Sequence, residues 1–523
     1  MKNKHIYLLL IWFIALLPTM ILRDFTPNNE LRYLSIVDEA LESGNIFTFT
    51  NQGLIYADKP PLFFWLMMLG KVLLNGHRMW FLSMLSFIPA LITLMTMIKW
   101  MHPSNRENEV STNNENAGVL MLMTSVLFIS LTIVVRMDML MIMFITLSLY
   151  TFYKIYKGEN HPRDTYLFPI YLFFALFSKG PVGILVPLIS TTLFLLFRKK
   201  INTFKKYWGW KSLLIILACS AIWFMGVYLE RGNEYLNNLL VHQTVGRGIN
   251  SFHHKEPFYY YAISIWYSLA PWSLLVIGLL VAGVYKRKIK SDIELFFLII
   301  ILSTFGFLSL VSSKLGVYLL PILPFTIFLS VLLLKKFNIQ NNWIKASIAV
   351  PAVTLIATLP VIIYLSSRDK TAYLAIPLIY IAASILTITG LATLFFLYKK
   401  KKPYKAIYSI SLGLLLTVFV AGWTLPQLNS QLGWSNLCTR AIELSKEKHI
   451  TDYYVYKISR AENMDVYLKK DVQMVTKEVI IENSFKNKLL LLPMKQVEND
   501  NDIFSIIKTK EHYQIGNNMI VVF

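Results

Sequence analysis

The sequence has little charge and almost no cysteine for a chain of 523 residues. Only 15% of its residues are Asp, Glu, Lys or Arg, whereas 55% are hydrophobic and the mean hydropathy is +0.51. Soluble globular domains carry about 25% charged residues, so this composition excludes an ordinary soluble protein. The two cysteines, Cys219 and Cys438, support neither a disulfide framework nor a cysteine metal site.

Acidic residues are also scarce, with 30 Asp and Glu against 51 Lys and Arg, which gives a net charge of +21. From Leu437 to the end, the chain holds 13 basic and 12 acidic residues, so +20 of the +21 lies before it. Positive charge in short loops between membrane spans is what the positive-inside rule predicts. The distribution therefore argues against a nucleic-acid partner and for a polytopic membrane protein.

Long apolar runs recur along the chain, and about 20 such residues are needed to cross a bilayer. The first, Ile6–Leu22, follows Lys2 and Lys4 and has no small-x-small cleavage site after it, so we expect an uncleaved helix. Twelve more follow, at about 79–101, 117–135, 138–156, 165–178, 181–197, 209–229, 260–285, 292–312, 315–334, 343–366, 372–398 and 405–424. We therefore predict an α-helical membrane protein with about 13 transmembrane helices. The 165–178 run is short, and merging it with its neighbour would change the count.

The positions of the basic clusters predict the topology. With a cytoplasmic N-terminus, the even-numbered spans end at Lys99 and Arg106, Lys154 and Lys157, Arg198–Lys200, Lys286–Lys288, Lys335–Lys336 and Lys399–Lys402. All six clusters then lie on the cytoplasmic side. Basic residues on the opposite, extracytoplasmic face go against this bias, and an anionic ligand would account for them.

The composition changes near residue 425. We expect a membrane domain at 1–424 and a small extracytoplasmic α/β domain at 425–523. The second alternates a helix-like piece, Leu437–Lys448, with strand-like pieces at Asp452–Ile458, Leu489–Leu492 and Met519–Phe523.

The first extracytoplasmic loop, 24–78, contains two helix-like stretches. Apolar residues at Leu31, Leu34, Val37 and Leu41 predict a helix lying on the membrane surface. Further on, Asp58-Lys59-Pro60-Pro61 opens a second helix and places a carboxylate and an ammonium at its N-terminus. The helix dipole favours an anionic headgroup there. The alternative is that Glu30, Arg32, Asp58 and Lys59 are solvated loop charges.

Several motifs occur in a fixed order on the extracytoplasmic face. They are Glu30-x-Arg32-Tyr33, Ser43-Gly44-Asn45, Tyr56-x-Asp58-Lys59-Pro60-Pro61-Leu62, Arg136-x-Asp138, Ser178-Lys179-Gly180-Pro181, Glu256-Pro257-Phe258-Tyr259 and Ser313-Lys314-Leu315-x-x-Tyr318-x-x-Pro321. This order, over about residues 20–325, resembles the GT-C glycosyltransferases. It is most similar to the lipid A aminoarabinose transferases and their relatives in the protein O-mannosyltransferase superfamily. The motifs are specific for the superfamily but not for the substrate.

The resemblance implies a glycosyltransferase of a bacterial inner membrane that uses a polyprenyl-phosphate-linked sugar, with undecaprenyl as the lipid. Lys59 and Arg247 match positions that hold the donor phosphate, and Lys314 either reaches a lipid phosphate or caps a helix. Asp58 and His242 match a pair that binds a divalent metal (Zn, Mg or Mn), with His253 or His254 as substitutes for His242. Residues expected to line the site are Arg32, Tyr33, Tyr56 and Tyr318.

One position departs from the family pattern, because Asn29 stands where relatives have an Asp proposed as the general base. Either the acceptor is already ionised, as a phosphate of lipid A is, or Glu30, Asp24 or Asp138 takes the role. The first explanation favours a glycolipid acceptor over a protein hydroxyl, which would make the chain a protein O-glycosyltransferase. Arg136-x-Asp138 is otherwise an ion pair at a helix end. From a different class, a lipid or ion transporter would place its ionisable groups near mid-membrane.

Overall fold

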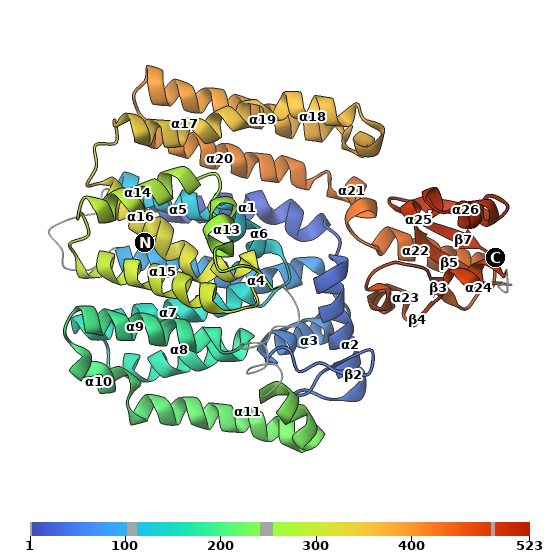
Figure 1. The fold of residues 1–523 in the computed structure, drawn as a ribbon, viewed down its shortest axis with the longest axis horizontal. Helices are drawn as coiled ribbons and strands as arrows, with labels where there is room; N and C mark the ends of the chain where they lie inside the picture. The colour runs from blue at the N-terminus through green and yellow to red at the C-terminus, as the bar shows by residue number, and fades with distance from the viewer. Residues whose placement is uncertain (1–2, 102–111, 241–254, 483–486) are drawn as a thin grey trace. The chain divides into compact units, whose positions relative to one another are not determined.

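The computed structural model describes residues 3–101, 112–240, 255–482 and 487–523 (Figure 1). The chain divides into two compact units. The helical unit comprises Met1–Met20, Ala57–Leu66 and Trp80–Ala421. The mixed unit comprises Ile21–Tyr56, Met67–Met79 and Gly422–Phe523, so it joins the first loop to the C-terminal segment. Each unit is described by itself.

The helical unit is built from helices that run over most of its length. They are α1 (Asn3–Leu22), α4 (Met79–Met101), α5 (Thr112–Met123), α6 (Val126–Ile133), α7 (Asp138–Lys157), α8 (Asp164–Lys179), α9 (Val182–Phe197), η2 (Ile201–Thr203), α10 (Phe204–Trp208), α11 (Trp210–Asn237), α13 (Tyr260–Ser268), α14 (Ser273–Tyr285), α15 (Asp292–Leu310), η4 (Gly316–Ile322), α16 (Leu323–Leu334), α17 (Asn342–Ile356), α18 (Thr358–Ser366), η5 (Asp369–Leu374), α19 (Pro377–Leu394), η6 (Phe395–Lys399) and α20 (Pro403–Gly422). All thirteen apolar runs of the sequence therefore fall on helical structure.

Nine segments of the described residues are long and apolar enough to cross a membrane, or ten if the bent pair α5 and α6 is one span. The other predicted spans are shorter or broken. α8 and α9 have 16 residues each, or about 24 Å at 1.5 Å per residue, which is less than the roughly 30 Å hydrocarbon core. α13 and α14 are separated by residues 269–272. The count of thirteen is therefore not confirmed, because periodicity and hydropathy do not show where a helix breaks.

Burial is uneven among the helices of this unit. Within its most apolar 18-residue window, the Gly316–Leu334 segment is 83% buried and α7 is 72% buried, against 17% for Asn342–Ser366. Aromatic rings fill the centre, for example Trp100 against Phe297 with ring centroids 5.1 Å apart. Asp138 is the first residue of α7 and Tyr318 lies in η4, so two candidate site residues belong to the most buried elements.

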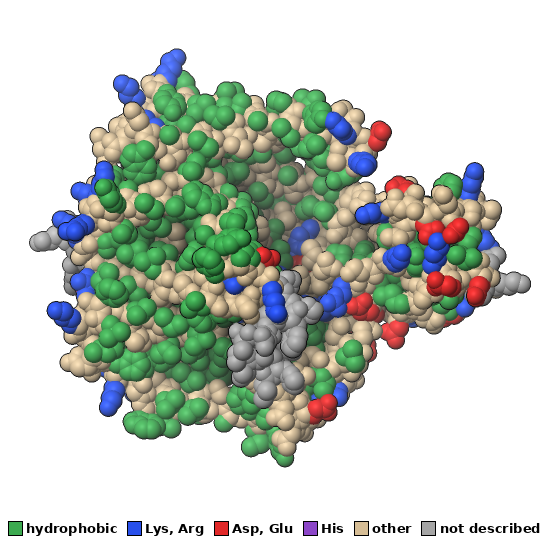
Figure 2. Space-filling model, in the orientation of Figure 1, with side chains coloured by type: hydrophobic (Ala, Val, Ile, Leu, Met, Phe, Trp, Pro, Cys, Tyr) green, Lys and Arg blue, Asp and Glu red, His purple; other side chains and the backbone are tan. Residues whose placement is uncertain are grey.

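Five of the six predicted basic clusters meet at one end of the helical unit. Asp292, at the start of α15, pairs with both Lys157 and Arg198. Lys336 pairs with Glu294 at 2.5 Å and donates to the Lys288 carbonyl at 2.8 Å. Gln340 donates to the Lys401 carbonyl at 2.9 Å. Figure 2 shows Lys and Arg side chains along the left-hand edge of this unit. The predicted clustering on one face is thus confirmed for these five.

The mixed unit contains short helices and two sheets. Its elements are η1 (Pro27–Leu31), α2 (Arg32–Ser43), β1 (Thr50–Asn51), β2 (Leu54–Ile55), α21 (Leu425–Leu432), α22 (Ser435–Glu447), β3 (Tyr453–Val455), η7 (Ala461–Met464), α23 (Asp465–Leu468), β4 (Val472–Met474), α24 (Lys477–Ile481), β5 (Leu489–Pro493), α25 (Met494–Glu498), α26 (Asn501–Lys508), β6 (Glu511–Ile515) and β7 (Asn518–Val522). α3 (Leu62–Leu74) is shared between the two units.

The larger sheet has the strand order β4-β3-β5-β7-β6. β3 is parallel to β4 and β5, and β7 is antiparallel to β5 and β6. The four leucines Leu489–Leu492 of β5 are fully buried on both faces, as expected for a central strand with a continuous apolar run. The helix and the three strands expected from the sequence are α22, β3, β5 and β7.

The helix predicted to lie on the membrane surface is present as η1 and α2, but its apolar face does not point outward. Leu31, Leu34 and Val37 are fully buried, and α2 contacts β1 and α23 of the same unit. These three side chains therefore contact protein, and the position of the helix at the membrane surface stays a prediction. An amphipathic pattern reports only that one face is buried, and here protein rather than lipid covers it.

Candidate functional site

A charged cluster lies at the end of the helical unit opposite the basic clusters. The Asp138 carboxylate, in the first turn of α7, pairs with Arg136 at 3.0 Å and with Lys179 at the end of α8. The Asp138 side chain is 1% exposed, and that of Lys179 is 9% exposed. One buried carboxylate thus contacts two basic side chains. The salt-bridge reading of Arg136-x-Asp138 is confirmed, and the cluster also suits an incoming anion.

Two further motifs meet this cluster. The Lys179 ammonium lies over the Tyr318 ring, 4.6 Å from its centroid. Trp65, near the start of α3, makes an edge contact with Phe177 in the last turn of α8, with centroids 5.3 Å apart. This contact brings the α3 start, which follows Asp58 and Lys59, to the helix end that carries Lys179.

Lys314 is buried and has a structural partner. Its ammonium donates to the Glu256 carbonyl at 2.9 Å, and Lys255 pairs with Ser313 in an antiparallel bridge. The lysine is 4% exposed. It therefore ties the 255–257 segment to the chain ahead of Tyr318. This geometry favours a positioning role over the predicted direct contact with phosphate.

Asp58 and Lys59 are half-buried just before the proline pair that precedes α3, as the sequence predicted. Their predicted partners Arg247 and His242, with His253 and His254, lie outside the described residues. Among the residues that the structure does describe, no group of three His, Cys, Asp or Glu side chains could hold a metal. Asp58 alone is one donor, so the metal site stays a prediction.

Glu30 is fully enclosed in the mixed unit. Both of its oxygens accept from the Arg23 guanidinium at 2.6 Å, and one also accepts from the Thr26 N–H at 2.7 Å. Both oxygens are thus committed to a buried ion pair, and breaking such a pair is costly. The placement argues for a structural role at the entry to α2 and against the predicted role as base.

Asp24 also has its acceptor positions filled. It accepts from the Phe25 N–H at 2.8 Å, from the Ser435 N–H at 2.8 Å and from the Tyr467 hydroxyl at 2.5 Å. Burial, together with the charge of Asp24, raises the pKa of Tyr467, so this phenol stays a donor. A Cβ on Gly433 would lie 2.0 Å from the carboxylate. Asp24 therefore anchors the first loop to the C-terminal segment.

Arg32 lies on an aromatic platform in the mixed unit. Its guanidinium carbon is 5.6 Å from the ring centroids of both Tyr33 and Tyr56. Its guanidinium also makes a long contact of 3.5 Å to the Asn29 amide oxygen. No carboxylate in the described part of the chain pairs with it, so this cation is available to an anionic or hydroxyl-bearing substrate.

The structure thus sorts the predicted residues into two groups. In the helical unit it brings Asp138 and Tyr318 together and ties the segment with Asp58 and Lys59 to the same end. In the mixed unit it brings Arg32, Tyr33 and Tyr56 together and uses Asp24 and Glu30 as anchors. Two members of the charged cluster, Arg136 and Lys179, were missing from the predicted site list. The signal was present in the sequence, since both are basic residues on the face where the positive-inside rule disfavours them.

Comparisons with known proteins bear on the fold. The family model for dolichyl-phosphate-mannose-protein mannosyltransferase matches residues 58–225. The chain also superposes on the crystal structure of ArnT from Cupriavidus metallidurans bound to undecaprenyl phosphate. The TM-score is 0.73 at 16% identity, with 100% of this chain and 98% of that chain covered. The chain therefore has the fold of the GT-C membrane glycosyltransferases, and the resemblance expected from its motifs is confirmed.

The sequence relatives point to one branch of this class. An undecaprenyl phosphate-alpha-4-amino-4-deoxy-L-arabinose arabinosyl transferase of Shewanella sediminis is 22% identical over 336 residues, covering 62% of this chain and 58% of the relative. An uncharacterised protein of Aquifex aeolicus is 27% identical over 356 residues, covering 67% and 68%. The matches span about half to two-thirds of the length of the curated relatives.

Proposed function

We propose that this protein is a glycosyltransferase that moves a sugar from a polyprenyl-phosphate donor to a glycolipid acceptor such as lipid A. The observation that carries the proposal is the meeting of Arg136, Asp138, Lys179 and Tyr318 at one end of the helical unit. The segment holding Asp58 and Lys59 reaches the same end through the Trp65–Phe177 contact. Relatives with this activity and the ArnT fold support it.

The chemistry requires fixed positive charge. When the anomeric C–O bond breaks, electrons move to the bridging oxygen and the polyprenyl phosphate leaves with growing negative charge. Cations fixed beside that oxygen stabilise the transition state more than the ground state. Lys59 supplies such a cation just before α3, and Lys179 places a second cation at the same end of the helical unit. A divalent ion held at Asp58 would add Lewis acidity, and no step of the proposal depends on it.

The acceptor proposal follows from the state of the three candidate bases. Glu30 and Asp138 sit in buried ion pairs, and the oxygens of Asp24 accept from three donors. A sugar or protein hydroxyl needs a base, whereas a phosphate monoester is already ionised. The occupied carboxylates therefore support a phosphate-bearing glycolipid over a protein acceptor.

The positions of the buried charges weigh against a transporter. In the described part of the helical unit, the buried acidic residues Glu115, Asp138, Asp164 and Glu294 all lie in the first turn of a helix. Transporters place ionisable groups near the bilayer midplane, often on broken helices. Charges at helix ends instead lie near the membrane faces, and Asp138 lies at the face that carries the proposed reaction site. We place that face outside the cytoplasm of a bacterial inner membrane, because the basic clusters occupy the other end.

The test is reconstitution of the purified chain with lipid A and two undecaprenyl-phosphate donors, one carrying 4-amino-4-deoxy-L-arabinose and one carrying a hexose. Mass spectrometry of the lipid A then reads out both the acceptor and the sugar. We expect a single sugar added to a phosphate of lipid A with one donor preferred. Modification of a co-reconstituted peptide with lipid A unchanged would exclude the glycolipid proposal.

A further inference from the structure

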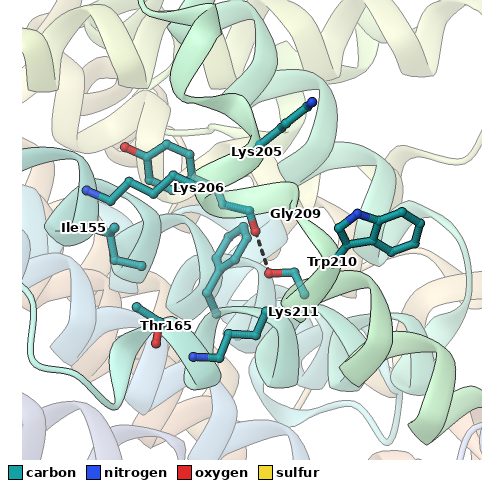
Figure 3. Close-up of a pocket in the computed structure, with 10 residues that line it drawn as sticks. Ile155, Thr165, Lys205, Lys206, Gly209, Trp210 and Lys211 are labelled. Atoms are coloured by element: carbon teal, nitrogen blue, oxygen red, sulfur yellow. Dashed lines mark hydrogen bonds between the residues drawn. The ribbon is translucent and has the colours of Figure 1, made fainter.

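A polar pocket lies at the end of the helical unit that carries the basic clusters, far from the proposed reaction site. Its lining includes Ile155 of α7, Thr165 of α8 and the α10–α11 corner with Lys205, Lys206 and Lys211 (Figure 3). α7 and α8 carry Asp138 and Lys179 at their opposite ends. Asp138 and Ile155 are separated by 17 residues, or about 26 Å of helix. The pocket is therefore a separate site.

The corner that forms this pocket is held rigidly. Trp208 donates to the Thr191 hydroxyl at 3.0 Å, and Ser212 donates to the Tyr207 carbonyl at 2.5 Å. The chain turns between α10 and α11 at Gly209, where a Cβ would lie 2.2 Å from the Lys205 carbonyl oxygen. Any larger residue would open the turn. The backbone that presents the lysines is thus fixed.

The lysines of this pocket lack acidic partners, unlike their neighbours at the same end. Lys157 and Arg198 share Asp292, and Lys154 pairs with Asp164. Lys206 and Lys211, by contrast, lie over the rings of Tyr207 and Tyr166, with distances of 5.9 and 3.6 Å to the ring centroids. No carboxylate of residues 3–101, 112–240, 255–482 or 487–523 pairs with Lys205, Lys206 or Lys211. Figure 3 shows Lys206 and Lys211 extending to the same side, with Ile155 and Thr165 between them.

An apolar stripe leads directly away from the lysines. Trp210, Leu213, Leu214 and Leu217 are all exposed and follow the i, i+3, i+4, i+7 spacing of one face of α11. Trp210 is 78% exposed beside Lys211, and Tyr166 under Lys211 is 51% exposed. Basic residues and aromatic rings at the start of an exposed apolar helix face match the headgroup and acyl layers of a bilayer.

Because the lysines of this pocket lie at the start of this exposed apolar face, we infer that Lys206 and Lys211 bind the phosphate of an anionic phospholipid. The acyl chains of this lipid lie along the Trp210–Leu217 face of α11. The ligand class is a phosphodiester headgroup such as that of phosphatidylglycerol. The first turn of α11 adds its partial positive charge. A soluble phosphate shares the headgroup chemistry but has no apolar part that could contact the stripe. The structure therefore favours a lipid. The inference does not depend on the proposed transferase activity.

The experiment measures binding of fluorescent phosphatidylglycerol to the full-length chain in detergent micelles, with phosphatidylcholine as reference. The variant is Lys206→Gln/Lys211→Gln. Its charge-matched control is Lys286→Gln/Lys290→Gln, two exposed lysines at the same end of the unit. Each basic residue at an anionic lipid surface contributes about fivefold in affinity, so we expect about a 25-fold loss for the variant at low salt. The loss should shrink as salt rises.

Three outcomes would overturn the inference. One is an equal loss of affinity in the control, which would mean that only net charge matters. Another is unchanged binding in the variant at an unchanged elution volume on size exclusion. The third is displacement of the lipid by millimolar inorganic phosphate with no preference for phosphatidylglycerol, which would assign the pocket to a soluble anion. Lys59→Ala should bind phosphatidylglycerol like the wild type, which separates this pocket from the reaction site.

Discussion

Replacing Asp138 with Ala tests the charged cluster most directly. The substitution removes the carboxylate that Arg136 and Lys179 share, and the buried Lys179 ammonium loses its ion pair. Because the Lys179 side chain is only 9% exposed, little water is available to solvate the ammonium. Removing one partner of a buried ion pair costs about 3–5 kcal/mol, since the remaining charge stays buried. We expect a loss of stability in that range.

The protein offers a matched comparison at its other end. Asp292 also bridges two cations, Lys157 and Arg198, but the three side chains are 22%, 25% and 30% exposed. Water solvates these groups when the pair is broken, so Asp292→Ala should cost only about 1 kcal/mol or less. The two variants make the same chemical change and differ in burial.

Thermal inactivation of the purified variants in detergent provides the measurement, and the ratio of inactivation rates converts to a difference in activation free energy. The double variant Asp138→Ala/Lys179→Met should recover part of the loss, because the buried Lys179 ammonium that lost its ion pair is gone. Equal inactivation rates for Asp138→Ala and Asp292→Ala would refute the reasoning. The reasoning would also be refuted if the double variant were no more stable than the summed effects of the two single substitutions predict.

Three other outcomes follow from the site and its surroundings. Lys59→Ala and Arg247→Ala should each fold normally and lower the transfer rate about 10²–10³-fold, measured with the preferred donor. Wild-type rates would show that these residues do not hold the donor phosphate. Glu30→Ala should leave the buried Arg23 without its carboxylate and speed proteolysis of the first loop, whereas a loss of activity with intact protease resistance would revive Glu30 as a base. Burial raises the pKa of Asp465 from 3.8 to about 6, so its contribution to stability is full below pH 3.8, declines as pH rises and is lost above about pH 6. The contribution of Asp465 to the free energy of unfolding is about 3 kcal/mol. Asp465→Asn should therefore flatten the pH dependence of hydrogen exchange in α2 and α23.

Much of the fold could be predicted because it depends on local patterns. Apolar runs located the membrane helices, the basic clusters grouped five helix ends at one face, and the Leu489–Leu492 run marked a central strand. The motif order also pointed to the GT-C class. The prolines after Lys59 correctly placed the start of α3, since proline fixes its own φ and has no N–H to donate.

The sequence alone determined that this is a polytopic membrane protein, which residues carry charge against the topological bias, and which class of transferase it resembles. Only the tertiary structure decided which charges meet. It paired Asp138 with Lys179, enclosed Glu30 with Arg23 and covered the apolar face of α2 with protein. Within the part of the chain that the structure describes, it also left Lys206 and Lys211 without acidic partners. Pairing depends on contacts between residues far apart in the chain, and local periodicity carries no information about such contacts.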